Sequence, residues 1–385
     1  MSQAIQILAG RARGAALVLL LAVPAGAHAG SALERIGVDL RPGDPGCVAS
    51  VRGRDGVEVE SHGGVRERGG AANDARTNFR LASVSKQFTA MAVMLLVADG
   101  RLAYDASLAD LLPGFPAWAR RVTVRHLLTH TSGMPDYERA MDRAAALGGT
   151  VYTPDRQVRD EDAIALLRRE PRLDFEPGTS WAYSNSAYVL LGEIVARADG
   201  RPFAEVLERR IFGPLGMRGT HLYVKGRNRV ERRAYGHEAQ RGELVPADQS
   251  ATSATQGDGG IYSNVADLAR WDAALREGTL LPTAAMQAAL VPVQLADGGQ
   301  THWPPDGDED DLAPGQPVSY GYGWFLDPLD GHRRMWHFGT TRGFRSAIMR
   351  LPDENMTAIV LCNRSDLDAR MIAERLLRDA LATRP

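Results

Sequence analysis

Residues 81–90 read Leu81-Ala-Ser-Val-Ser-Lys86-Gln-Phe-Thr-Ala90, so a lysine stands three residues after Ser83. The chain has 45 basic residues, of which only Lys86 and Lys225 are lysines. Arginine stays protonated at any biological pH, whereas a lysine can lose its proton when it is desolvated or lies near other positive charge. A chain that uses arginine almost everywhere but keeps a lysine here indicates that this amine acts on the serine hydroxyl, as in an activated nucleophile.

The sequence from Ser83 to Ala98 predicts a buried helix. It contains no proline or glycine, is rich in Ala, Met, Leu and Val, and ends at the stop signal Asp99-Gly100. Ser83 would open this helix, and Lys86 would lie on the same face beside the partial positive charge of the helix N-terminus. Burial and this charge would both favour the neutral amine that a base requires. The alternative of a surface lysine at a helix end does not fit an apolar helix, because an unpaired buried lysine is costly.

The N-terminal segment 1–29 is typical of a secretory signal peptide. Arg11 and Arg13 precede the apolar run Ala15–Val23, and Ala27-His-Ala29 provides a small-x-small cleavage site. This run is too short to span a bilayer, and no later segment is apolar enough to do so. We therefore expect an exported protein, periplasmic or secreted, without a membrane anchor. The formal net charge of −2 gives no reason to expect a nucleic-acid partner.

Strand-like segments occur near both ends of the chain, and helical segments occur between them. The expected strands are Cys47–Val51, Val57–Glu60, Tyr322–Leu326, Met335–Phe338, Phe344–Leu351 and Met356–Cys362. Among the helical segments, residues 187–199 are stopped by Gly200 and residues 267–276 by Gly278. A last helix would follow the final strand, with Ser365 as its cap.

This order of elements predicts an α/β (α+β) fold in which both termini build one central antiparallel sheet flanked by helices. A mostly helical domain would be inserted between the two halves of the sheet. We expect the sheet domain at residues 30–89 plus 315–385 and the inserted domain at residues 90–314. A surface loop is expected near residues 292–318.

Three sequence features bear on a possible disulfide and on possible metal sites. Cys47 begins one expected strand and Cys362 ends another, so the pair could form a disulfide in an exported protein or could simply be small core residues. The acidic stretch Pro304–Pro317 has the alternating acids of a calcium loop but lacks the glutamate at the twelfth position, which favours a solvated surface loop. No His-Glu-x-x-His or comparable spacing is present, so we expect no metal and no cofactor.

Two further short motifs carry groups that a serine–lysine pair needs. Tyr183-Ser-Asn185 offers a hydroxyl that can accept the serine proton and an amide that can bind a substrate, although Asn185 could instead cap the next helix. Tyr262-Ser-Asn264 has the same three letters, but Asn264 fits the cap of the following helix, and spacing alone cannot choose between the two. His337-Phe-Gly339 lies on a C-terminal strand whose small residue would let a substrate lie against the strand edge.

Taken in order, Ser83-Val-Ser-Lys86, Tyr183-Ser-Asn185 and His337-Phe-Gly339 resemble the three motifs of serine hydrolases related to class C β-lactamases and D,D-peptidases. Residues 122–137 resemble the family's loop beside the active site, and residues 176–185 its lead-in to the tyrosine. The resemblance covers roughly residues 44 to 382 and implies a β-lactamase/transpeptidase-like fold.

The resemblance also implies roles. Ser83 would be the acylated nucleophile, and Lys86 and Tyr183 would move its proton, with Tyr183 as the base. The N–H groups of Ser83 and Thr340 would form the oxyanion hole, and Tyr137 would either line the acyl pocket or pack in the core. The residues expected to bind the substrate are Asn185, His337, Gly339, Thr340 and Tyr137.

The third motif departs from the β-lactamase pattern. It begins with His337 where those enzymes have a lysine, and its middle residue is Phe338 where a hydroxyl residue is usual. Thr340 and Arg342 would compensate only in part. An esterase or D-amino-acid peptidase acting on a small-molecule or peptide substrate therefore fits better than an efficient β-lactamase. The alternative is a penicillin-binding or sensor protein that is acylated at Ser83 without turnover, and a Ser-His-Asp hydrolase is disfavoured because no Gly-x-Ser-x-Gly elbow occurs.

Overall fold

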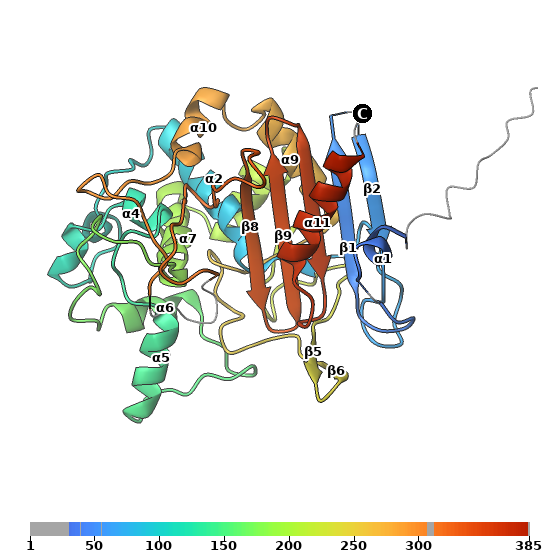
Figure 1. Ribbon diagram of the computed structural model, residues 1–385. Coiled ribbons are helices and arrows are strands. Elements are labelled where there is room, and N and C mark those ends of the chain that lie inside the picture. The colour runs from blue at the N-terminus through green and yellow to red at the C-terminus, as the bar shows by residue number, and fades with distance from the viewer. Residues whose placement is uncertain (1–30, 39, 55, 306–311, 384–385) are drawn as a thin grey trace, which may run out of the picture.

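A five-stranded antiparallel sheet forms the centre of the protein, with strand order β2-β1-β10-β9-β8 (Figure 1). The computed structural model describes residues 31–383 apart from residues 39, 55 and 306–311. The expected signal peptide and the centre of the acidic stretch lie outside the described residues. The strands are β1 (Cys47–Gly53), β2 (Gly56–His62), β8 (Met335–Thr341), β9 (Phe344–Leu351) and β10 (Met356–Cys362). Both termini of the chain therefore build one sheet, which confirms the expected fold class.

The pairing of β1 with β10 settles the question that the cysteines left open. In this antiparallel pair Cys47 lies directly opposite Cys362, and a disulfide joins them. The bond closes a sequence separation of 315 residues and so ties the first strand of the sheet to the last. Because both cysteines are fully buried, they fill the core as well as forming the cross-link.

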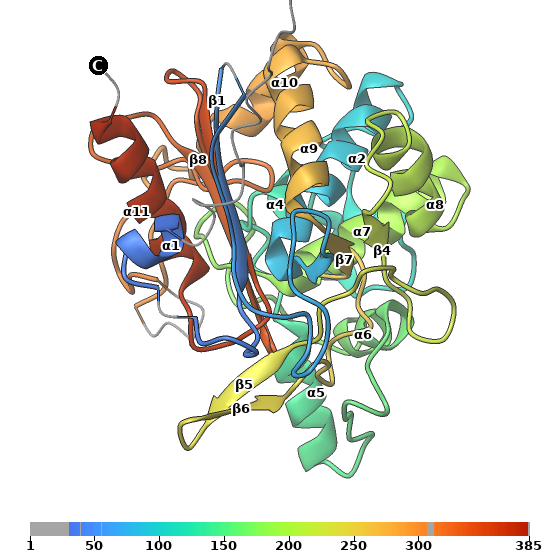
Figure 2. The same cartoon turned by 90° about the vertical axis from the view of Figure 1, so that its right-hand side faces the viewer.

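Helices cover both faces of the sheet (Figure 2). Helices α1 (Ser31–Arg35) and α11 (Ala369–Ala382) pack on one face, and α2 (Lys86–Ala98) and α9 (Val265–Glu277) lie on the other. Side chains of a strand alternate between faces, so neighbouring residues join different cores. Ala49 and Val360, paired across β1 and β10, belong to the core under α11, whereas the adjacent pair Val48 and Leu361 belongs to the core around α2.

The rest of the chain forms a mostly helical region beside the sheet. Its helices are α3 (Leu108–Leu111), α4 (Val124–Leu128), α5 (Tyr137–Ala146), α6 (Asp160–Leu167), α7 (Asn185–Asp199), α8 (Phe203–Leu207) and α10 (Thr283–Leu290), with shorter helical turns at Ala82–Ser85, Ala117–Arg120 and Glu208–Phe212. Short strands also occur in this region: β3 (Phe79–Arg80), β7 (Ile261–Ser263) and β4 (His221–Leu222) form one small sheet, and β5 (His237–Gln240) pairs with β6 (Glu243–Pro246). The expected domain boundaries at residues 89 and 314 stay predictions.

Helix α2 is the buried helix that the sequence predicted. Its residues from Lys86 to Leu96 are all buried, and it ends beside Gly100 as expected. The start differs from the prediction, because Ser83 does not open the α-helix. It lies in a turn of 3₁₀-helix, Ala82–Ser85, that leads directly into α2. This tighter turn still keeps residues three apart on one side, so Ser83 and Lys86 remain neighbours.

The expected strand Tyr322–Leu326 is wrong. Only single bridges connect Phe325 to Tyr320 and to Trp336 in this segment. Gly323 has a φ of +77°, and a Cβ atom there would lie 3.0 Å from the carbonyl oxygen of Lys86, so the chain turns tightly against the start of α2. The segment is therefore shaped by this close approach to the backbone of α2, which an extended strand would not allow.

Two helix boundaries also differ from the sequence-based expectations. The cap of α11 is Asp368, whose carboxylate accepts a hydrogen bond from the Met371 N–H, whereas the Ser365 hydroxyl accepts one from the Ala239 N–H. The segment 122–137, which resembles the family's loop beside the active site, is not all loop, because it contains α4 and the first residue of α5, Tyr137. Asp and Ser both stabilise helix N-termini, so the sequence alone does not decide whether Ser365 or Asp368 caps α11.

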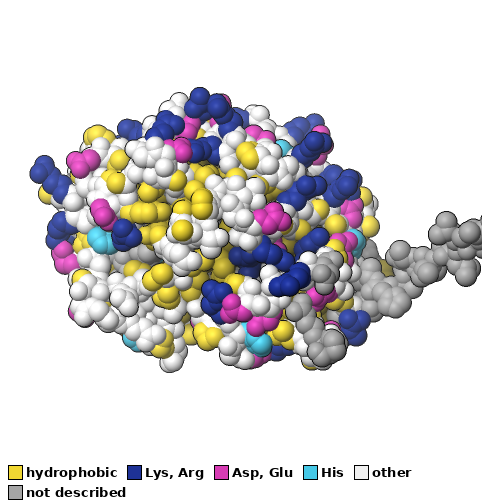
Figure 3. Space-filling model, turned by 90° about the horizontal axis from the view of Figure 1, so that it is seen from above, with side chains coloured by type: hydrophobic (Ala, Val, Ile, Leu, Met, Phe, Trp, Pro, Cys, Tyr) yellow, Lys and Arg dark blue, Asp and Glu magenta, His cyan; other side chains and the backbone are white. Residues whose placement is uncertain are grey.

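The surface seen from above in Figure 3 mixes charges of both signs. Arg and Lys side chains alternate with Asp and Glu, and hydrophobic side chains gather near the middle of this face. This face therefore has no broad area of a single charge.

Within the described residues, no helix is both long and apolar enough to cross a membrane.

Candidate active site

Lys86 lies at the centre of the candidate site. Its side chain is 0% exposed, and its ammonium nitrogen lies 2.9 Å from Ser83 Oγ, 2.8 Å from Asn185 Oδ1 and 3.1 Å from the carbonyl oxygen of Asp258. An unpaired buried ammonium would be strongly destabilising, but three oxygen partners compensate for the lost water. The first two motifs thus meet at one nitrogen.

The three contacts of Lys86 define how a proton can move. The amide oxygen of Asn185 and the carbonyl of Asp258 can only accept hydrogen bonds, so two N–H groups point at them. The third valence faces Ser83 Oγ. In the ammonium form an N–H at this position donates to the Ser83 oxygen. In the neutral amine a lone pair at the same position can receive the proton of the Ser83 hydroxyl.

The turn that carries Ser83 is fixed from two sides. The N–H of Leu81 donates to Ile261 O at 2.9 Å, and the hydroxyl of Ser346 on β9 donates to Leu81 O at 2.6 Å. The next residue, Ala82, has a φ of +48°, a left-handed conformation that costs an L-residue about 1 kcal/mol. Surrounding contacts must hold this strained residue in place, which is common beside catalytic groups.

Gly339 explains the small residue of the third motif. A Cβ atom at this position would lie 2.1 Å from Leu81 O and 2.4 Å from Ser346 Oγ. Only a glycine lets β8 approach the Leu81–Ala82 backbone this closely. Gly339 therefore packs behind the nucleophile turn rather than lining the cavity that contains Ser83.

The start of α7 places Tyr183 and Asn185. Ser184, not Asn185, caps this helix, because its hydroxyl accepts a hydrogen bond from the Ala187 N–H at 3.2 Å. The Asn185 side chain is therefore left to bind Lys86, and its backbone N–H donates to Asp136 Oδ2 at 3.1 Å. The ring of Tyr183 lies with its centroid 4.8 Å from the Lys86 nitrogen.

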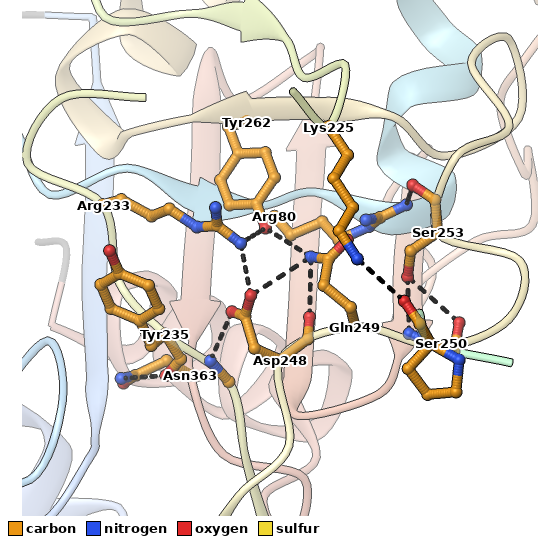
Figure 4. A network of polar contacts seen from close by, with 12 residues as sticks. Arg80, Lys225, Arg233, Tyr235, Asp248, Gln249, Ser250, Ser253, Tyr262 and Asn363 are labelled. Atoms are coloured by element: carbon orange, nitrogen blue, oxygen red, sulfur yellow. Dashed lines mark hydrogen bonds and ion pairs between the residues drawn. The ribbon is translucent and has the colours of Figure 1, made fainter. Parts of the chain in front are cut away.

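Tyr262, from the second Tyr-Ser-Asn, belongs to a different network of polar contacts, which Figure 4 shows. The Tyr262 hydroxyl accepts hydrogen bonds from Arg233 Nη2 at 2.9 Å and from Gln249 Nε2 at 3.3 Å. Asn264 caps α9 by accepting from the Asp267 N–H, as predicted. Residues 262–264 therefore have structural partners, and residues 183–185 are the ones brought to Lys86.

His337 is a buried neutral ring. It is 0% exposed, its Nδ1 lies 2.7 Å from Phe338 O, and its Nε2 lies 3.1 Å from the Tyr320 hydroxyl. The carbonyl can only accept, so Nδ1 carries the proton and Nε2 accepts from Tyr320. Burial, followed by the positive charge of Lys86, lowers the pKa of His337 to about 3. His337 does not line the cavity that contains Ser83, and it brings no charge to the site at neutral pH.

His130 is a site residue that sequence reasoning missed. It is fully buried, its Nδ1 accepts from the Ser184 N–H at 3.2 Å, and its ring lies 4.5 Å from that of Tyr183 and 4.6 Å from that of Tyr320, measured between centroids. Burial and then the charge of Lys86 hold its pKa well below the ordinary value. The sequence places His130 in a polar loop, and nothing in that pattern indicates that it packs against Tyr183.

A cavity of about 370 Å³ opens beside Ser83 and Asn185. Thr340, expected to share the oxyanion hole with Ser83, borders this cavity and also a second, smaller one that contains Tyr183. Trp303, from the expected surface loop near residues 292–318, borders the smaller cavity, so that part of the loop reaches the site. The structure thus groups Ser83, Tyr183 and Thr340 around one opening.

Tyr137 packs in the core, which was one of its two expected alternatives, and its role in an acyl pocket stays a prediction. It is fully buried at the first position of α5, and it also borders the larger cavity. Its hydroxyl lies 3.3 Å from Thr255 Oγ1 and 3.4 Å from Asp258 Oδ2.

Within the part of the chain that the structure describes, no group of three or more His, Cys, Asp or Glu side chains could hold a metal ion.

Comparisons with known proteins agree with this arrangement. A protein-family model described as Beta-lactamase matches residues 39–382. Penicillin-binding protein 4* of Bacillus subtilis (strain 168) is 31% identical over 337 residues, which cover 83% of this chain and 68% of that protein. A D-aminopeptidase of Cereibacter sphaeroides is 28% identical over 343 residues, which cover 88% of this chain but only 60% of that protein's length. The solved structure of a penicillin binding protein from Bacillus halodurans has a TM-score of 0.71 at 26% identity, covering 92% of this chain and 99% of that one.

Proposed function

The chain belongs to the Beta-lactamase family, and from this membership we propose that it is an exported serine hydrolase that forms an acyl-enzyme at Ser83 and hydrolyses amides or esters. The observation that carries the proposal is the buried Lys86 nitrogen, which bridges Ser83 Oγ at 2.9 Å and Asn185 Oδ1 at 2.8 Å. A buried, fully coordinated lysine beside an accessible serine is a costly arrangement that a purely structural role would not require.

In the proposed reaction, Ser83 Oγ attacks the acyl carbon while its proton passes to Tyr183 with Lys86 alongside. The N–H groups of Ser83 and Thr340 hold the developing oxyanion. The acyl carbon then forms an ester bond to Ser83, and the bond to the leaving amine or alcohol breaks as that group takes the proton. Water attacks the ester by the reverse route, releasing the acid and returning a proton to Ser83.

The substrate class follows from charge at the third motif. A β-lactam carries a carboxylate, and the neutral His337 supplies no fixed positive charge to hold it. One relative is named a D-aminopeptidase, which supports amides of D-amino acids as the substrates to test. An ester or D-amino-acyl amide is therefore the proposed substrate, in preference to a β-lactam.

Export is supported by the N-terminal sequence and by the disulfide. Residues 11–29 have the basic, apolar and cleavage regions of a signal peptide. The Cys47–Cys362 bond would form and persist in an oxidising compartment, such as the periplasm or the medium.

A second candidate is a penicillin-binding or sensor protein that is acylated at Ser83 without turnover. The observation in its favour is the similarity to Penicillin-binding protein 4*, the curated relative at 31% identity. The two candidates share the nucleophile and differ in whether water can release the acyl group.

The first test is hydrolysis of p-nitrophenyl butyrate by the mature protein beside its Ser83→Ala variant. We expect continuous release of p-nitrophenol by the wild type and none above background in the variant. Equal rates in both proteins would refute Ser83 as the nucleophile. A single burst without turnover, with a long-lived β-lactam adduct on Ser83, would favour the binding protein.

A further inference from the structure

His130 holds the backbone on both sides of Tyr183. Its carbonyl oxygen accepts a hydrogen bond from the Ala182 N–H at 3.0 Å, and its Nδ1 accepts one from the Ser184 N–H at 3.2 Å. Residues 180–184 belong to no helix or strand, so their backbone depends on such single hydrogen bonds for its position. Tyr183 therefore lies between two backbone groups that are both bound to one residue.

The ring of His130 also packs against the side chain of Tyr183. The two ring centroids lie 4.5 Å apart, at an interplanar angle of 39°. His130 is fully buried and borders neither of the two cavities that contain Ser83, whereas Tyr183 is half-buried and borders the smaller one. His130 therefore lies behind Tyr183 and does not touch a substrate that is bound in these cavities.

A residue that only filled the core would not need to be a histidine here. His130 has a φ of +60°, a left-handed conformation that costs an L-residue about 1 kcal/mol. Because Nδ1 accepts, Nε2 carries the proton, and this buried donor meets no hydrogen-bond partner among the described residues. A hydrophobic side chain would avoid this second cost but would lose the acceptor. The Nδ1 acceptor is thus the property that this position requires.

We propose that His130 is a positioning residue that fixes the hydroxyl of Tyr183 beside Ser83, so that catalysis depends on the Nδ1 acceptor of His130 while substrate binding does not. The Tyr183 ring centroid lies 4.8 Å from the Lys86 nitrogen, and a proton can pass between these groups only in a narrow range of geometries. A displacement of about 1 Å in such a group costs up to about 100-fold in rate. This inference rests on the proposed function and adds a residue to it.

The test compares His130→Phe, which keeps a ring but loses the acceptor, with His130→Asn, whose amide oxygen can take the place of Nδ1 and which tolerates a left-handed backbone. We expect His130→Phe to lower kcat and kcat/KM for p-nitrophenyl butyrate alike, by at least about tenfold. His130→Asn should keep kcat within about threefold of wild type. Equal losses in the two variants would overturn the inference, because the acceptor would then not be what matters.

Urea unfolding of each variant separates a loss of rate from a loss of fold. If His130→Phe does not fold, His130→Gln takes its place, because its longer side chain carries the amide oxygen toward the position of Nε2 instead of Nδ1. The same loss of at least about tenfold is expected. Wild-type kcat in a folded variant without the acceptor would overturn the inference.

His126 provides the matched control. It precedes His130 in the same segment 122–137, and its Nδ1 likewise accepts a backbone N–H, from Thr123 at 3.2 Å, at the start of α4. His126→Phe removes the same kind of hydrogen bond from α4 rather than from the segment that carries Tyr183, and it should keep kcat within about threefold of wild type. Equal losses in His126→Phe and His130→Phe would overturn the inference, because they would reflect only the folding of this segment.

Adding Tyr183→Phe shows whether His130 acts through the Tyr183 hydroxyl. In that background no hydroxyl remains to be positioned, so His130→Phe should change the residual rate by less than about twofold. A further loss of about tenfold would overturn the inference. If the Tyr183→Phe rate equals the background, the single variants decide. All these outcomes leave the proposed function intact, whereas ester cleavage that survives Ser83→Ala would refute the proposed function, and this inference would fall with it.

Discussion

His337 should make the folded protein lose stability in acid. In the unfolded chain its ring takes up a proton near the ordinary pKa of 6.5, whereas burial and the charge of Lys86 hold the folded pKa at about 3. Between these values the unfolded state binds a proton that the folded state does not, so the free energy of unfolding falls as pH falls. For a shift from 6.5 to 3 the loss between pH 7 and pH 5 is about 2 kcal/mol.

The measurement is urea unfolding of wild type and His337→Gln at pH 7, 6 and 5. Glutamine can still accept from Tyr320 but does not titrate, so the variant should lose about 2 kcal/mol less than wild type between pH 7 and pH 5. Other buried groups shift as well: the pKa of His130 is lowered, and the pKa values of Asp136 and Asp160 are raised by burial. Asp136 and Asp160 are present in both proteins, so their effects cancel in the difference, and burial, the largest cause of the lowered pKa of His130, is the same in both.

His302→Gln serves as a control, because this histidine is exposed in the folded protein. It should leave the pH dependence of unfolding as it is in the wild type. The same acid sensitivity in wild type and His337→Gln would refute the reasoning, because it would mean that the ring of His337 takes up its proton equally in both states.

Three further predictions concern the nucleophile and its supports. Lys86→Arg should lower kcat for p-nitrophenyl butyrate by at least about 100-fold, because a guanidinium cannot accept a proton; a rate within tenfold of wild type would contradict the proton-transfer role. Tyr183→Phe should cost far more ester hydrolysis than Tyr262→Phe, and comparable losses would mean that the wrong Tyr-Ser-Asn was chosen. Gly339→Ala should lower the free energy of unfolding by roughly 2 kcal/mol or more, since its Cβ would lie 2.1 Å from Leu81 O; unchanged urea unfolding would show that β8 does not constrain the nucleophile turn.

Much of the fold could be predicted from local sequence patterns. The strands Phe344–Leu351 and Met356–Cys362 have the bounds expected from their apolar runs, because each is bordered by a clear turn signal. The segment Tyr322–Leu326 has a similar composition but does not form a strand. Its backbone is shaped by Gly323 against α2, a contact between residues far apart in the sequence that no local pattern contains. The disulfide likewise depends on register, which the spacing of cysteines does not specify.

The site could be predicted in part. Ser83 and Lys86 are linked by local helical spacing, so the sequence alone indicates that they meet. Sequence spacing could not show whether Asn185 or Asn264 lies at the active site. It depends on which residue caps the helix, and Ser184 takes that role at the start of α7. The contact of Lys86 with the carbonyl oxygen of Asp258 could not be predicted either, because it joins residues far apart in the sequence.

The charges around Lys86 argue for a particular kind of substrate. Full burial keeps His337 neutral, and the charge of Lys86 further disfavours a second cation there. The nearby Arg342 on the β8–β9 side is paired with Glu238, so a substrate carboxylate would have to compete for it. Asp258 and Arg80 both border the larger cavity, and both have buried side-chain atoms without a hydrogen-bond partner among the described residues. The charges that border the cavity are therefore of both signs, and the neutral His337 is the observation that places esters and amides before β-lactams as substrates to test.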